Sequence, residues 1–115
     1  MSKASRREKA VQSVAEEKSD DTEALIEDFV KRVRDLPQVR RVLVERARRF
    51  PKIYTVIQAE GSDLERRRPV YDAELAAMDM HPGVLVDWDM VDLADYRSVS
   101  LEQILPADLQ TRLER

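Results

Sequence analysis

The sequence predicts a small α+β domain with the order helix–helix–strand–helix–strand, and three observations support this fold class. The 115 residues are enough for one domain, and 43% of them are hydrophobic, which suffices for a core. Apolar residues recur at helical spacing in some segments and alternate as in strands in others. Only two residues are glycine, which favours a helix-rich chain over a sandwich or barrel with many turns.

Residues 1–20 are predicted to form a flexible charged tail, because their few apolar side chains cannot offset the entropy lost on ordering. The single domain then covers residues 21–115. Asp20 and Glu23 have the spacing of a capping box, so a first helix is expected to begin there. Its apolar stripe consists of Leu25, Ile26, Phe29, Val30, Val33 and Leu36.

Pro37 interrupts this stripe, and proline suits the first turn of a new helix. The helical spacing continues through Val39 and Val42 up to Phe50, which predicts either a second helix or one helix kinked at Pro37, and two helices are favoured. In the segment KIYTVIQ, residues 52–58, β-preferring side chains alternate and both faces are apolar. A strand in the middle of its sheet is therefore expected there.

A further helix is predicted from Ser62, which has capping-box spacing with Glu65, to about Met80. One face of this helix collects most of its large apolar side chains, so that face is expected to point into the core. Its members are Leu64, Val70, Tyr71, Glu74, Leu75 and Met78.

Residues 83–93 alternate as a second strand, whose apolar face is expected to pack on the helices. A short helix is predicted over residues 100–105, and a final helical turn or frayed end over 106–115. A two-stranded sheet is marginal on its own. We therefore expect either an extra strand near residues 96–99 or a partner chain that completes the sheet, which favours a homodimer.

The composition excludes several kinds of site. No cysteine is present, so disulfides, zinc–thiolate centres and thiol nucleophiles are excluded. No apolar run is long enough to span a bilayer and no signal-peptide pattern is present, so a cytoplasmic protein without membrane contact is expected. The single histidine, His81, cannot build a histidine-rich metal site, and we expect no metal or cofactor.

The charges are divided along the chain. Residues 31–59 carry nine basic and two acidic side chains, whereas residues 60–115 carry six basic and thirteen acidic ones. The favoured interpretation is that the two segments pair within the molecule or between subunits. The alternative is that the basic segment neutralises the phosphates of a nucleic acid. Its central residues are expected on the polar side of the second helix, and they are Arg40, Arg41, Arg48 and Arg49.

One glutamate and one pair of aspartates are candidates for binding a ligand or a metal ion. Glu74 falls on an expected apolar face beside Tyr71, so its carboxylate needs a partner, a raised pKa or a ligand. An ion pair with one of the arginines at 66–68 or in the basic segment is favoured over a general-base or ligand role. Asp87 and Asp89 share one face of a strand and could bind Mg²⁺ or Ca²⁺, although a solvated acidic face is favoured.

The motifs YTVI, VYDAEL and VDWDMVDL, which fall between Ile53 and Leu93, resemble a group of short uncharacterised bacterial proteins. Met78 and Pro82 lie between the second and third motifs. The similarity covers roughly the last two-thirds of the chain. This resemblance implies an α+β fold and no particular activity.

The favoured function is that of a small non-enzymatic accessory or protein-interaction module that self-associates. It accounts for the lack of a catalytic motif and for the opposed charges. One alternative is a nucleic-acid-associated regulator or antitoxin-like protein that uses the basic segment 31–52. The other is a ligand-binding domain or enzyme built around Tyr71 and Glu74.

Overall fold

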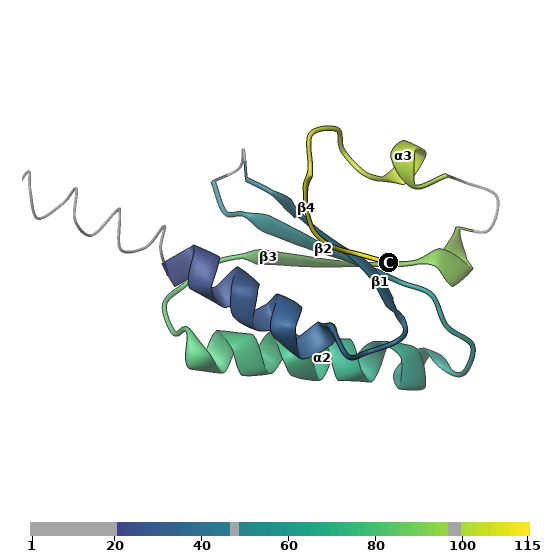
Figure 1. Cartoon of the computed structure of the whole chain (residues 1–115), viewed down its shortest axis with the longest axis horizontal. Helices are drawn as coiled ribbons and strands as arrows, with labels where there is room; N and C mark the ends of the chain where they lie inside the picture. Colours follow the sequence, from purple (N-terminus) through teal and green to yellow (C-terminus); the bar gives the residue numbers. More distant parts are fainter. Residues whose placement is uncertain (1–20, 47–48, 97–99) are drawn as a thin grey trace, which may run out of the picture.

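The computed structural model describes residues 21–46, 49–96 and 100–115, and the tail predicted over residues 1–20 lies outside them. Two long helices cover one face of a four-stranded mixed sheet (Figure 1). The opposite face carries a connecting segment that includes the short helix α3 (Leu101–Ile104). The α+β fold class predicted from the sequence is therefore confirmed.

The N-terminal helix is described over residues 21–33, and its predicted apolar stripe packs against the sheet. Leu25, Ile26 and Phe29 are fully buried. The ring of Phe29 meets Trp88 of the sheet edge-on, with 4.8 Å between the ring centroids. The first predicted helix is thus confirmed over most of its length.

The second predicted helix is wrong, because Val39–Glu45 form strand β1. Val39, Val42 and Val44 all belong to the core beneath the helices, and the first two have the i, i+3 spacing of a helix. This spacing arises because the register with the next strand shifts at Arg40, as in a β-bulge. The β-branched valines favour the strand, and the bulge explains why its pattern resembles a helix.

Strand β2 (Lys52–Ile57) lies in the middle of the sheet, as predicted, and all of its residues after Lys52 are buried. It pairs antiparallel with β1 and parallel with strand β3 (Asp87–Asp92). The apolar side chains Trp88 and Met90 of β3 pack towards the helices, as expected from their alternation.

Helix α2 (Asp63–Met80) forms the crossover between these parallel strands. It begins at the predicted cap, where the Ser62 hydroxyl accepts a hydrogen bond from the amide of Glu65. Its core face differs from the prediction, because two alanines allow close packing where the large side chains were expected. The buried residues are Val70, Ala73, Glu74 and Ala77, whereas Leu64, Tyr71 and Leu75 are exposed.

The fourth strand is β4 (Gln110–Glu114), so the prediction of a helical turn or frayed end over 106–115 is wrong. The strand order is β3-β2-β1-β4, with β4 antiparallel to β1. The extra strand expected near 96–99 is not observed at Tyr96, which follows the 3-10 helix η1 (Leu93–Asp95), and residues 97–99 lie outside the described part. Since one chain supplies four strands, no partner chain is needed to complete the sheet.

Apolar side chains pack on both faces of the sheet. The larger core lies between the sheet and the two helices. On the open face, Leu43, Tyr54, Val56 and Val91 are buried beneath the segment that follows β3. This second core is less complete, because the side chains that cover it are only partly buried; they are Leu93, Leu101, Ile104, Leu105 and Leu109.

Candidate functional site

The most deeply buried charge on the described chain is Asp92, at the end of β3. Its Oδ2 accepts hydrogen bonds from Arg66 Nη2 at 2.8 Å and from Arg67 Nη2 at 3.2 Å. Its Oδ1 accepts a hydrogen bond of 3.0 Å from the amide of Ala94. Arg67 also pairs with Asp95 at 3.1 Å. The cluster thus joins the first turns of α2 to the carboxyl end of β3.

Desolvation raises the pKa of Asp92, but the hydrogen bonds from Ala94, Arg66 and Arg67 outweigh it and hold that pKa below its usual value. The hydrogen bond to Asp92 in turn raises the pKa of Arg67. A carboxylate whose two oxygens are both occupied has little capacity left for a ligand or a proton. The arrangement therefore stabilises the packing of the crossover helix α2 against β3. No local sequence pattern indicates it, because Asp92 lies 26 residues from Arg66.

Asp87 and Asp89 lie on the open face of the sheet, opposite the helices. Asp89 is 3.5 Å from Lys52 Nζ, and this ammonium lies 5.1 Å from the centre of the Tyr54 ring. The Tyr54 hydroxyl donates a hydrogen bond of 2.9 Å to Glu45. Each of these groups has an interaction partner within the protein. Among the residues that the structure describes, no set of three His, Asp or Glu side chains is placed to hold a metal ion.

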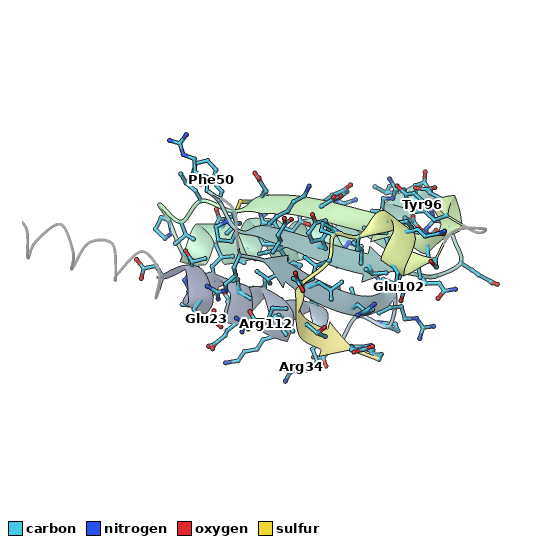
Figure 2. All side chains as sticks on the ribbon, turned by 90° about the horizontal axis from the view of Figure 1, so that it is seen from above. Glu23, Arg34, Phe50, Tyr96, Glu102 and Arg112 are labelled. Carbon is cyan, nitrogen blue, oxygen red and sulfur yellow. The ribbon has the colours of Figure 1, made fainter. Side chains whose placement is uncertain are left out.

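The basic residues do not share one helix face, so that prediction is wrong. Arg40 is exposed at the bulge of β1, and Arg41 lies 3.9 Å from Glu114 of β4. Arg49 lies over the ring of Phe50, whereas Arg48 falls outside the described residues. Figure 2 shows Phe50 projecting beyond the end of the sheet.

Several of these cations pair with carboxylates elsewhere in the chain. Arg41 pairs with Glu114 and Lys52 with Asp89, so both pairs join the basic segment to the acidic one. Arg46 pairs with Glu23 of the N-terminal helix. These contacts support pairing of the two charge segments within the molecule. The basic side chains are more scattered over the surface than they would be on one face of a helix.

Glu74 is buried on α2, as its position in the pattern suggested, with 8% of its surface exposed. The predicted ion pair is not observed, because neither residues 66–68 nor the described arginines of the basic segment contact its carboxylate. Desolvation raises the pKa of Glu74 to about 7. Glu74 does not line the groove beside Arg41 and Leu43, nor the hollow beside Val30 and Arg112.

The outer face of α2 carries three large apolar residues that were predicted to point into the core, Leu64, Tyr71 and Leu75, which are spaced seven and four residues apart. Arg68 and Asp72 lie on the same face. Leu64 is 65% exposed, Tyr71 46% and Leu75 56%. Their spacing is that of one helical stripe. Of the face predicted to point into the core, Val70 and Glu74 are buried as predicted, whereas Leu64, Tyr71 and Leu75 face solvent.

A groove lies on the opposite side of the molecule, between strand β1 and the segment that covers the open face. Its volume is about 350 Å³. Leu43 and Arg41 line it from β1, and Leu101, Leu105 and Leu109 line it from the covering segment. None of the leucines was singled out from the sequence, because they become neighbours only when β4 pairs beside β1.

No protein-family model, curated protein or solved structure matches the chain. The resemblance to short bacterial proteins therefore rests on the quoted motifs alone. No helix among the described residues is long and apolar enough to cross a membrane. Any function must therefore be inferred from the exposed residues and hollows of the protein.

Proposed function

We propose that the protein is a non-enzymatic interaction module that self-associates through the outer face of α2. The observation that carries this proposal is the exposure of Leu64, Tyr71 and Leu75 in one stripe. Large apolar side chains exposed singly are ordinary, but a stripe of them along one helix is typical of a binding surface. Burial of this stripe against another helix supplies the hydrophobic free energy of association.

The charges on this face favour a second copy of the chain as the partner. In an antiparallel pair of α2 helices with its two-fold axis near residue 70, Leu64 of one copy faces Leu75 of the other. The same axis brings Arg68 beside Tyr71 and Asp72 of the second copy. Neither Arg68 nor Asp72 has an ion pair with any other described residue, so both are available for this contact.

The two edges of the sheet are less suited to self-association. Edge strand β3 carries Asp87 and Asp89, and charges on an edge discourage pairing with a further strand. Edge strand β4 has only five residues, and its register with β1 shifts at Arg112. A helix-to-helix interface therefore replaces the sheet-to-sheet interface that the two-strand prediction favoured.

Sedimentation equilibrium at micromolar concentrations tests the proposal with two matched variants. Leu75→Glu places a charge in the stripe, whereas Leu85→Glu places the same charge at an equally exposed leucine outside α2. We expect the unaltered protein and L85E to be dimers, and L75E to have a dimer dissociation constant at least about tenfold higher. A monomeric unaltered protein, or equal dissociation constants for L75E and L85E, contradicts the proposal.

A further inference from the structure

The groove on the open face has the dimensions and lining of a binding site for a small molecule. Its volume of about 350 Å³ falls in the range of ligand pockets, about 300 to 1,000 Å³. Leu43 of β1, together with Leu101, Leu105 and Leu109 of the covering segment, provides an apolar lining. These covering leucines are only partly buried, so some of their apolar surface is exposed at the groove.

Arg41 supplies the positive charge of this groove, which Glu102 and Thr111 also line. Its Nε is buried and has no hydrogen-bond partner among the residues that the structure describes. The carboxylate of Glu114 lies 3.9 Å from this nitrogen, which is beyond hydrogen-bond distance, and 62% of the Glu114 side chain is exposed. A buried donor without an acceptor is costly, so an acceptor brought by a ligand is favoured there.

Backbone irregularities lie on both sides of Arg41. The register of β1 with β2 shifts just before it, and the register of β1 with β4 shifts just after Val42. Such bulges change the direction in which side chains project and are common beside binding sites. Arg41 itself shares the open face of the sheet with Leu43, two residues further along β1, as ordinary strand alternation requires.

We infer that this groove binds a small molecule with an apolar body and a carboxylate, and that Arg41 holds the carboxylate. A guanidinium binds carboxylates with two hydrogen bonds in a fixed geometry, which suits this chemistry better than a neutral polar group. The leucines contact the hydrocarbon portion. Glu102, also at the groove, is exposed, so solvent and salt screen its charge from the ligand. This site lies on the face of the sheet opposite α2 and is independent of the proposed self-association.

Octanoate and octan-1-ol are suitable probes, because they share a hydrocarbon chain and differ in charge. Each is titrated into the ¹⁵N-labelled full chain, and amide chemical shifts are followed by NMR. The matched variants are Arg41→Gln at the groove and Arg40→Gln, its exposed neighbour on the same strand. We expect saturable shifts at Leu43, Leu101 and Leu105, with octanoate bound at least about tenfold more tightly than octan-1-ol.

In R41Q this preference for the carboxylate disappears, whereas R40Q retains it. If R41Q does not fold, the affinities of the unaltered protein for octanoate and octan-1-ol still test whether the groove prefers a carboxylate. Octanoate that causes no saturable shifts, shifts that map away from the groove, or equal affinity for the two probes overturns the inference.

Discussion

Arg66 of α2 donates a hydrogen bond of 2.8 Å to Asp92 at the end of β3, and only 1% of the Asp92 side chain is exposed. This contact joins the start of the crossover helix to the last parallel strand. Removing one partner of a buried ion pair leaves the other charge without compensation. The contact therefore has a measurable role in the stability of the fold.

Asp92→Asn is expected to lower the free energy of unfolding by about 3 kcal/mol, because Arg66 and Arg67 lose a buried anion. Urea denaturation followed by circular dichroism measures the change. Asp95→Asn, which removes an exposed partner of Arg67, serves as the control and is expected to cost no more than about 0.5 kcal/mol. Equal effects of the two substitutions would show that Asp92 is not the centre of this cluster.

Glu74 makes stability depend on pH in the opposite direction from an ordinary paired carboxylate. Burial raises its pKa from 4.5 to about 7 in the folded protein, so the folded state binds the proton more tightly than the unfolded state. The contribution of this group to stability is therefore greatest below pH 4.5. It decreases as pH rises from 4.5 through 7 and is constant above that range.

Glu74→Gln removes this ionisation while keeping the shape of the side chain. We expect the variant to be about 2 kcal/mol more stable than the unaltered protein at pH 8, after allowance for solvent screening, and equally stable at pH 4.5. Denaturation curves at several pH values provide the measurement. A variant that is destabilised equally at every pH would instead indicate a hydrogen bond or ion pair at Glu74.

The packing of the N-terminal helix depends on Phe29, which is fully buried against Trp88. Phe29→Ala is expected to lower the free energy of unfolding by about 3 to 5 kcal/mol, through lost burial and the cavity that remains. Phe50→Ala is a control at a partly exposed phenylalanine near the β1–β2 connection, and its expected cost is at most about 1 kcal/mol. Thermal unfolding that does not distinguish the two variants would contradict this packing.

The N-terminal helix and β4 meet at Glu23 and Arg112, which Figure 2 shows together. The Arg112 guanidinium donates a hydrogen bond of 2.7 Å to the Glu23 carboxylate. A double-mutant cycle with Glu23→Gln and Arg112→Gln is expected to give a coupling energy of about 1 kcal/mol, since both side chains are partly exposed. Strictly additive effects in this cycle would contradict a stabilising contact between Glu23 and Arg112.

The sequence predicted the elements whose hydrophobic period is regular. The N-terminal helix, α2, β2 and β3 were all recognised from apolar spacing or capping residues. Strand β1 was mistaken for a helix because the bulge at Arg40 places Val39 and Val42 on one face. Strand β4 was missed because QTRLE contains a single apolar residue, and its pairing with β1 depends on tertiary contact rather than local preference.

The candidate sites were less accessible to sequence reasoning. The predicted core face of α2 is correct for Val70 and Glu74, which are buried, and wrong for Leu64, Tyr71 and Leu75, which are exposed, because Ala73 and Ala77 complete the packed face instead. Large apolar side chains do not identify the core face of a helix when small ones permit closer packing. The partner of Asp92 and the lining of the groove join residues far apart in the chain, so no local pattern could indicate them.

Cross-linking through introduced cysteines tests the antiparallel contact of α2 most directly. The sequence contains no cysteine, so only the introduced thiols react. Leu64→Cys and Leu75→Cys are combined in one chain, which is treated with a short bis-maleimide and compared with each single variant. The two positions are eleven residues apart, about 16 Å along the helix, which is too far for a short linker within one copy. We expect covalent dimers of the double variant and few covalent dimers of either single variant. No cross-linked dimer, or dimers formed equally well by a single variant, would contradict it.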